Sequence, residues 1–474
     1  MSARLLAFWD DIRSSYWFIP TLMVLAAIAL SFVTTTIDGR IGAGWIENVS
    51  WLYGNKPDGA RGLLSTVAGS MIGVAGVTFS ITIASVVYAS GQYGPRLLTN
   101  FMQDRGNQIT LGTFIATFLY CLLVLRTVRA ADEVTGGDNP AGDVVGAFVP
   151  HVAIATALVL VLASVGVLIF FIHHVPHSIH VSNLIAGVGG DLEKHINMLF
   201  PRRIGEGRPD EETREDDEIR TDLPEDFVRE ADPICADSAG YIQGVSEEGL
   251  IDIAREHDLL IRMRRRPGDF VAEGDVLVLA WPSSRVDQEV RDRLRIAFAW
   301  GSQRSAVQDA RFLVNELVEI AARALSPGVN DPFTAITCLD WLGAALKTLT
   351  EREFPSVRRY DEEGALRVIA EPTTFEEFVQ HVFGQLRPYA ASDRNAALHA
   401  LRVLGEIGGR TENPDHRASL RRQADALHEG AQSALTLEAD RLAVAEKHRL
   451  VVRILSGVPY SEIAAQSDWI GGSA

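Results

Sequence analysis

The chain has 474 residues, of which 47% are hydrophobic and 22% are charged, and its formal net charge is −17. Residues 1–204 hold 12 basic and 12 acidic side chains, so the remaining 270 residues carry 32 of the 44 basic and 49 of the 61 acidic groups. This division excludes a wholly soluble chain, and the acidic excess excludes a nucleic-acid-binding protein, which needs basic groups to release counterions from phosphates.

Four uncharged stretches in the first part are long enough to cross a bilayer, which takes about 20 helical residues. We expect transmembrane helices at about residues 15–37, 63–92, 107–126 and 149–173, within a membrane domain of residues 1–204. An even number of spans places both ends of this domain on one side. Seven Lys and Arg residues fall on that side and five on the other, so the positive-inside rule predicts that both termini are cytosolic.

The second span is rich in small residues, including a Gly69–Gly73 pair and Ala68, Gly76, Ser80 and Ala84 at four-residue spacing. Small residues let helix backbones approach closely in a bilayer. The candidate residues for a pore or for helix packing on this span and the next are Gly69, Gly73, Thr78, Thr82, Ser85, Thr113 and Thr117. Two interpretations remain open: the hydroxyls line a hydrated path, or they form hydrogen bonds between packed helices. The spans have no acidic or basic residue at mid-membrane, which argues against an ion-driven pump but not against a passive pore.

Histidines follow the fourth span. His173, His177 and His180 are three or four residues apart and are weak candidates for metal binding on one helix face, although Pro176 is expected to interrupt that helix. The alternatives are imidazoles that sit at the membrane interface or a pH-responsive collar. No cysteine or paired carboxylate completes a metal site, so the sequence predicts no cofactor.

Residues 205–227 form an acidic stretch that is typical of a flexible linker. A small β module is expected at residues 228–283, with strands at Ala239–Val245 and Leu259–Arg266 and a short helix at Ile251–His257. The run RPGDFVAEGDVLVLAWP contains turns at Pro267–Gly268 and Glu273–Asp275. It resembles the hairpin of biotinyl/lipoyl-type barrels without their Met-Lys-Met, and a β-barrel-like module is therefore expected.

Four arginines cluster in this acidic region: Arg262, Arg264, Arg265 and Arg266. They are candidates for binding anionic lipid headgroups. The alternative is that they form ion pairs with the linker or with neighbouring carboxylates.

Residues 284–474 have the apolar spacing of helices. The expected helices are Asp287–Phe298, Ser305–Ala324, Pro332–Arg352, Phe375–Leu386, Arg394–Ile407 and about Pro414–Leu455, with a small hairpin at Arg358–Ile369. The predicted fold class is therefore an α-helical membrane protein with four transmembrane helices, followed by an α+β cytosolic region.

A corner between two of these helices carries polar residues. The candidates for a ligand site or a corner motif in this region are Arg304, Asp309, Ser326, Asn330, Asp331 and Thr334. Gly328 suits the left-handed end of one helix, and Asp331 before Pro332 suits the start of the next. The same polar groups at a helix N-terminus would also attract an anion.

Three runs carry a resemblance to a known family: SMIGVAGVTFSITIASVVYASGQYGPRLL, GYIQGV with RPGDFVAEGDVL, and ALSPGVNDPFTA. Together they resemble the predicted bacterial membrane proteins of domain of unknown function family 2254, over nearly the whole chain. The resemblance implies an integral protein of the bacterial inner membrane. It implies no activity and no catalytic residues.

Two functions are therefore expected from different classes. The first is a channel-like or transport-related homo-oligomer in the bilayer with a cytosolic sensing or assembly domain. The second is a membrane-anchored scaffold or signalling partner whose acidic domain binds another protein. The chain has no P-loop, GxSxG or kinase signature, so catalysis is not predicted.

Overall fold

The computed structural model of the chain describes residues 15–41, 57–94, 104–130, 148–200 and 223–465. These residues divide into two compact units, one before and one after the boundary between His180 and Val181. We call them the membrane unit and the C-terminal unit. The predicted acidic linker lies largely outside the described residues.

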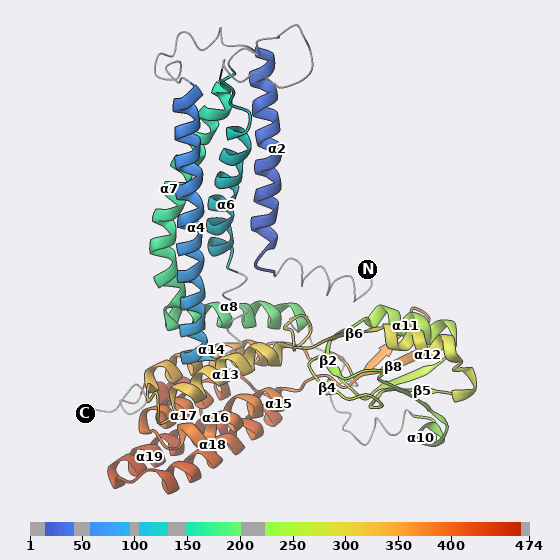
Figure 1. The fold of residues 1–474 in the computed structure, drawn as a ribbon. Coiled ribbons are helices and arrows are strands. Elements are labelled where there is room, and N and C mark those ends of the chain that lie inside the picture. Colours follow the sequence, from blue (N-terminus) through green and yellow to red (C-terminus); the bar gives the residue numbers. More distant parts are fainter. Residues whose placement is uncertain (1–14, 42–56, 95–103, 131–147, 201–222, 466–474) are drawn as a thin grey trace. The chain divides into compact units, whose positions relative to one another are not determined.

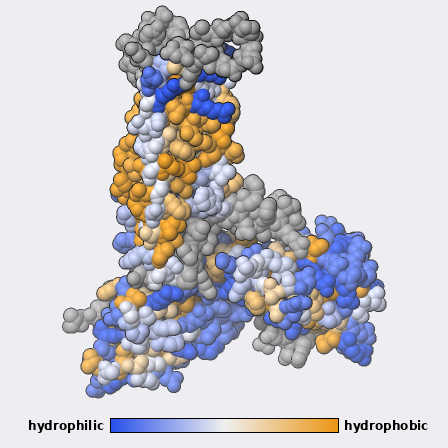
Figure 2. All heavy atoms as spheres, in the orientation of Figure 1, coloured by the Kyte–Doolittle hydropathy of each residue, from blue (hydrophilic) through white to orange (hydrophobic). Residues whose placement is uncertain are grey.

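The membrane unit is a bundle of long apolar helices, labelled in Figure 1. Its helices are α2 (Phe18–Ile41), α4 (Pro57–Tyr93), α6 (Arg105–Leu125) and α7 (His151–Ile179). Among the described residues, these four are long and apolar enough to cross a membrane, which confirms the four predicted spans. Figure 2 shows apolar residues over much of the visible face of the bundle, as a lipid environment favours.

Helix α6 is the centre of the bundle. It packs against α2, α4 and α7, and 56% of its most apolar stretch is buried, against 22–28% in the other three helices. Its fully buried Tyr120 hydroxyl donates to the carbonyl oxygen of Ala153 at 3.1 Å and lies 2.9 Å from the hydroxyl of Thr34. One phenol on α6 therefore bonds to two of its three neighbouring helices, α2 and α7.

The carboxylate of Asp38 ties α2 to the start of α7. Its two oxygens accept hydrogen bonds from the backbone N–H groups of Val152 and Ala153, at 2.8 and 2.9 Å. These N–H groups belong to the first turn of α7, where a helix leaves donors without internal partners. The bond also places a negative charge at the positive end of the helix dipole.

The C-terminal unit begins with α8 (Val181–Leu199), which packs against α13 (Ala310–Ala324) and α14 (Pro332–Thr350). The division between units thus falls at residue 180 rather than at the expected residue 204. The reason is that α8 is amphipathic and buries Leu184, Val188 and other apolar residues within this unit.

Two sheets form the β part of the C-terminal unit. Its strands are β1 (Asp232–Cys235), β2 (Gly240–Val245), β3 (Leu260–Met263), β4 (Phe270–Val271), β5 (Val276–Trp281), β6 (Phe298–Gly301), β7 (Arg358–Tyr360) and β8 (Leu366–Ile369). One sheet has the order β1-β5-β3-β8-β7 and the other β4-β2-β6. The described strands therefore do not form the barrel-like module expected from the sequence. One apolar core, which includes Ile242 and Ile261, contains residues of both sheets.

Three of the described strands come from beyond residue 283, where the sequence predicted a helical domain. The predicted hairpin at Arg358–Ile369 is confirmed as β7 and β8, and β8 pairs in parallel with β3 through Ile261 and Val368. The helix expected at Asp287–Phe298 ends at Ile296, and Phe298 is instead the first residue of β6. The sheets thus draw on segments far apart in the sequence.

The remaining elements are mostly helical and agree with the expected periodicity. They are α10 (Phe227–Glu230), α11 (Glu247–Glu256), a 3₁₀ turn (Ser283–Arg285), α12 (Gln288–Ile296), α15 (Phe375–Val379), a π-helical turn (Gln380–Gly384), α16 (Gln385–Ala390), α17 (Arg394–Gly408), α18 (Pro414–Ala434), α19 (Glu438–Leu455) and α20 (Tyr460–Ala464). The expected helix Pro414–Leu455 is two helices, because α18 and α19 pack against each other. The Arg441 guanidinium donates to the carbonyl oxygens of Leu435 and Thr436 at the break.

Substitution of Gly189 tests the packing of α8. A Cβ added there would lie 2.5 Å from the ring of Trp341 on α14, so we expect Gly189→Ala to destabilise the C-terminal unit by about 1–3 kcal/mol through overpacking. At Gly190, one residue further along the same helix, an added Cβ meets no atom within 4 Å. Gly190→Ala should therefore stabilise the helix by up to about 1 kcal/mol. Urea unfolding of the full chain measures both, and equal effects would contradict this packing.

Candidate functional site

The candidate hydroxyls of α4 point into the bundle. Thr78 and Thr82 are each only 3% exposed, and the Thr82 hydroxyl donates to the carbonyl oxygen of Thr78 at 3.0 Å. Ser85, one turn further on, is half-buried. Within one protomer these groups therefore contact protein.

The candidate hydroxyls of α6 also contact protein. Thr117 is buried, and its oxygen lies 3.1 Å from the hydroxyl of Ser164 on α7. Thr113 is half-buried and donates to the carbonyl oxygen of Ile109 at 2.8 Å. For these threonines the geometry favours the helix-packing interpretation over the pore interpretation.

The glycines of α4 lie on the opposite side of the helix, outside the bundle. Gly69, Gly73 and Gly76 are exposed, and a Cβ added at any of them would meet no atom within 4 Å. The exposed Ser70 and Ser80 lie on the same outer side. We call these five residues the outer face of α4. Ala68, which the four-residue spacing grouped with them, is buried against the bundle.

The histidine run continues α7 as far as Ile179, so the helix passes through Pro176 instead of stopping there. His173, His177 and His180 are all exposed. Among the described residues, no group of three or more His, Cys, Asp or Glu side chains is arranged to hold a metal ion. The neighbouring His174, which the sequence analysis did not single out, lies 2.7 Å from the carboxylate of Asp104 at the start of α6.

The predicted corner between α13 and α14 is formed as a capped turn. Asp331 is the N-cap of α14 and accepts hydrogen bonds from the backbone N–H and the hydroxyl of Thr334, at 3.2 and 2.6 Å. The residue with a left-handed backbone is Asn330 (φ 51°), where the sequence suggested Gly328. Ser326 donates to the carbonyl oxygen of Arg323 at 2.6 Å. Ser326 and Thr334 thus bond within the corner, which favours the corner interpretation over an anion site.

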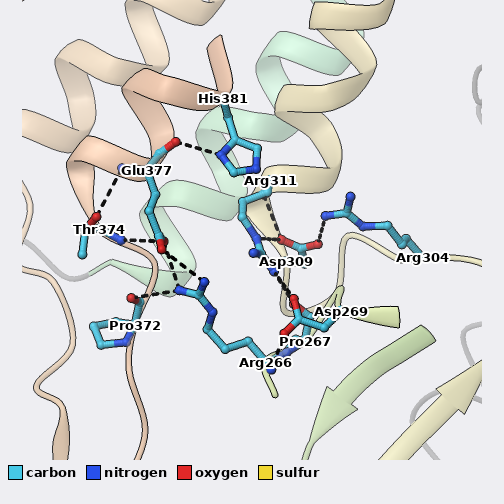
Figure 3. Close-up of polar contacts among 10 residues, drawn as sticks. All are labelled: Arg266, Pro267, Asp269, Arg304, Asp309, Arg311, Pro372, Thr374, Glu377 and His381. Carbon is cyan, nitrogen blue, oxygen red and sulfur yellow. Dashed lines mark hydrogen bonds and ion pairs between the residues drawn. The ribbon is translucent and has the colours of Figure 1, made fainter. Parts of the chain in front are cut away.

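A buried ion-pair network connects the start of α13 to the loop between β3 and β4 (Figure 3). Asp309, 3% exposed, is the N-cap of α13, and its oxygens lie 2.5 Å from the guanidinium of Arg304 and 2.8 Å from that of Arg311. The Arg311 guanidinium also donates to the carbonyl oxygen of Pro267 at 2.7 Å and lies 3.5 Å from Asp269. The buried charges thus compensate each other, as burial requires.

The turn in this network depends on glycine. Gly268 has φ 88°, a backbone conformation that side chains disfavour, and an added Cβ would clash with the carboxylate of Asp309. The predicted turn at Pro267–Gly268 is thereby confirmed, together with the second turn at Gly274, which also has φ 88°.

A second arm of the network joins the same loop to α15. Arg266 forms a bidentate pair with Glu377, at 3.0 and 3.2 Å, and donates to the carbonyl oxygen of Pro372 (Figure 3). Glu377 also forms the capping box of α15 with Thr374. Burial alone would raise the pKa of Glu377, but the hydrogen bonds and charge of Arg266 outweigh it and hold this pKa below its usual value.

The arginine cluster is largely paired within the C-terminal unit. Besides the Arg266 pair, Arg262 lies 3.2 Å from Glu371 and Arg265 lies 3.1 Å from Asp275. The guanidinium of the exposed Arg264 has no acidic partner among the described residues. For three of the four arginines the geometry supports the ion-pair interpretation.

Three of these four arginines border a cavity of about 370 Å³ that lies within the C-terminal unit. Its wall contains Arg264, Arg265, Arg266 and Arg311 together with apolar side chains such as Leu250 and Met263. Of the site residues predicted from the sequence, the structure thus gathers Arg264, Arg265, Arg266 and Asp309 around one hollow. The wall does not include Arg262, Arg304, Ser326, Asn330, Asp331 or Thr334.

The comparisons with known proteins agree with this architecture. A family described as predicted membrane protein (DUF2254) matches residues 13–406, which is most of the chain, and the chain therefore belongs to that family. Uncharacterised proteins of Mycobacterium bovis and Mycobacterium tuberculosis are each 29% identical to it over 452 residues, covering 94% of this chain and 81% of theirs. No solved structure matches the chain.

Removal of the Asp309 charge tests the buried network. Asparagine caps a helix as well as aspartate does, so Asp309→Asn should keep the cap but remove the carboxylate that Arg304 and Arg311 share, which leaves the buried Arg311 with only the more distant Asp269 at 3.5 Å. We expect the free energy of unfolding to fall by about 3–5 kcal/mol. The control is Glu446→Gln, which breaks the exposed pair with Arg449 and should cost less than about 0.5 kcal/mol. Similar losses in both variants would show that burial adds nothing to the Asp309 pair.

Glu377→Gln tests the Arg266 pair through pH. When folding lowers the pKa of a carboxyl group, ionisation of that group stabilises the folded state. This stabilisation is fully present above the ordinary glutamate pKa of 4.5, and it is lost as the pH falls through the lower pKa of the folded state. Glutamine still suits the capping box but does not ionise. The variant should therefore be less stable than wild type at neutral pH, and the difference should shrink below pH 4.5. Urea unfolding at several pH values measures this, and a pH-independent difference would be the contrary result.

Proposed function

We propose that this member of the DUF2254 family is an oligomeric protein of the bacterial inner membrane with a channel-like function. In this proposal several subunits meet through the outer face of α4, and both termini and the C-terminal unit are cytosolic. The C-terminal unit senses a ligand or supports assembly. No catalytic role is assigned to it, and the chain binds no nucleic acid.

The outer face of α4 is the observation that carries the proposal. Lipid offers apolar helices no hydrophobic drive to associate, so close backbone packing over small residues takes its place. Gly69, Gly73 and Gly76 expose backbone without contact inside the protomer. Because the same face is present on every copy, a second copy of α4 is a complementary partner for it.

The outer face also supports the channel-like part of the proposal. The Ser70 and Ser80 hydroxyls donate to backbone carbonyls one turn earlier, at 2.5 and 2.9 Å, and as exposed oxygens they keep lone pairs that can accept hydrogen bonds. A path lined by hydroxyls and glycine backbone suits passive permeation. The interior of a single bundle is a less suitable route, since Tyr120, Phe114 and Cys121 fill it.

The second candidate function is a membrane-anchored scaffold without transport. It is favoured by the excess of acidic residues after residue 204, which suits a basic protein partner. In that case the outer face of α4 would serve assembly alone.

Gly69→Leu with Gly73→Leu tests the assembly. Two leucines on the outer face should separate the helices, so the mass of the protein in nanodiscs should fall from an oligomer to a monomer. Leucine favours a helix over glycine by close to 1 kcal/mol per residue, so the variant should still fold. The control is Gly166→Leu on α7, an exposed glycine with equally open surroundings, which should leave the mass unchanged.

Ion flux into proteoliposomes then separates the two functions. Flux through wild-type protein that disappears in the Gly69/Gly73 variant and persists in Gly166→Leu is the result expected of a channel. An oligomer without flux would reject the channel and favour the scaffold. If the wild-type protein is a monomer in nanodiscs, both the proposed oligomer and the proposed permeation path are rejected.

A further inference from the structure

The cavity of the C-terminal unit has the size of a small-ligand site. Its volume of about 370 Å³ lies at the lower end of the range for ligand pockets. Its wall combines the loop after β3, strand β8, and the starts of α11 and α13. The hollow therefore lies where the sheets meet the helices.

One part of the wall is apolar. Leu250 and Ile251 of α11, Met263 of β3, Val368 of β8 and Phe378 of α15 contribute side chains to it. Of these, Ile251 and Met263 remain only partly buried although they pack against the core of the unit. A ligand with a compact apolar group would complete their burial.

The charged part of the wall contains five arginines and four carboxylates. They are Arg264, Arg265, Arg266, Arg311 and Arg359, with Glu247, Asp269, Asp309 and Glu371. Most of these groups are paired: Arg265 with Asp275, Arg266 with Glu377, Arg311 with both Asp309 and Asp269, and Glu371 with Arg262. Because the pairs neutralise each other, they leave little net charge to attract a ligand.

Two arginines have no such partner. Among the described residues, the guanidinium of Arg264 has no acidic partner, and that of Arg359 donates only to the backbone carbonyl oxygens of Ser356 and Arg358. Glu247, at the exposed start of α11, is the remaining carboxylate of the wall. Two unpaired cations against one carboxylate leave an excess of positive charge in a part of the chain that is acidic as a whole.

We infer that this cavity binds a small amphipathic anion, a phosphate or carboxylate that carries a compact apolar group. Arg264 and Arg359 bind the anionic group, and the wall formed by Leu250, Ile251 and Met263 contacts the apolar group. Arginine suits this role because its planar fork matches phosphate and carboxylate oxygens. The inference deepens the sensing role in the proposed function and rests on it only for that role, since neither the cavity nor its charges involve α4.

Calorimetric titration of the full-length protein in nanodiscs tests this inference, with titration of empty nanodiscs subtracted. The probe is hexyl phosphate, and the comparison ligands are inorganic phosphate and hexyl glucoside. We expect one hexyl phosphate per chain, and at least about tenfold weaker binding of each comparison ligand, because each lacks one of the two recognised groups.

The variant Arg264→Gln with Arg359→Gln should weaken hexyl phosphate binding at least about tenfold. Both side chains border the cavity and neither has an acidic partner among the described residues, so the fold should survive, which circular dichroism verifies. The matched control is Arg410→Gln, an exposed arginine outside the cavity wall, which should leave binding unchanged.

Four results would overturn the inference. If inorganic phosphate bound as tightly as hexyl phosphate, the apolar wall would not contribute to recognition. If hexyl glucoside bound as tightly as hexyl phosphate, the arginines would not contribute to it. Unchanged binding in the folded double variant, or no binding of hexyl phosphate, would reject the site. The nanodisc mass of the Gly69/Gly73 variant is a separate readout, so failure here is distinguishable from failure of the proposed assembly.

Discussion

A bilayer solvates neither charge nor free backbone polar groups, and the membrane unit depends on this constraint throughout. Its polar side chains bond to protein within the bundle: Tyr120 to Ala153 and Thr34, Thr117 to Ser164, and Asp38 to the first turn of α7. The polar character of the inner helix faces is therefore used in packing. The outer face of α4 consists of small residues that lie outside the bundle, and these residues are the basis of the assembly that we propose.

The C-terminal unit meets the same constraint with ionised groups. Asp309, nearly buried, is compensated by Arg304 and Arg311, and Arg311 in turn holds the loop at Pro267. This loop also carries Arg266, which reaches α15. The loop between β3 and β4 thus connects the sheets to α13 and α15 through ion pairs. The cavity lies beside that loop, so its shape depends on the same bonds.

The spans and most helices were predictable, because uncharged length and apolar periodicity are local properties of the sequence. The faces of α4 were not predictable from the same spacing. A four-residue spacing advances about 400° on a helix with 3.6 residues per turn, so Ala68 and Ala84 lie on different sides.

The buried ion-pair network around Asp309 could be predicted only in part. Asp309 and the arginine cluster were identified as candidates, but Arg311 and Glu377 become their partners only through contacts that the local sequence pattern does not encode. The strand β6 was missed because Phe298 also suits the apolar spacing of the preceding helix, and the three residues that follow it are too few to show a strand pattern.

The parallel pairing of β3 with β8 has a consequence for biosynthesis. Ile261 leaves the ribosome well before its partner Val368, with about 107 residues between them, and at about 5–20 residues per second this delay lasts roughly 5–20 seconds. During that interval one edge of β3 has no neighbour, and an open strand edge invites pairing with other chains. A nascent chain that stops before β8 would keep this edge open, so complete synthesis through β8 protects the protein from aggregation.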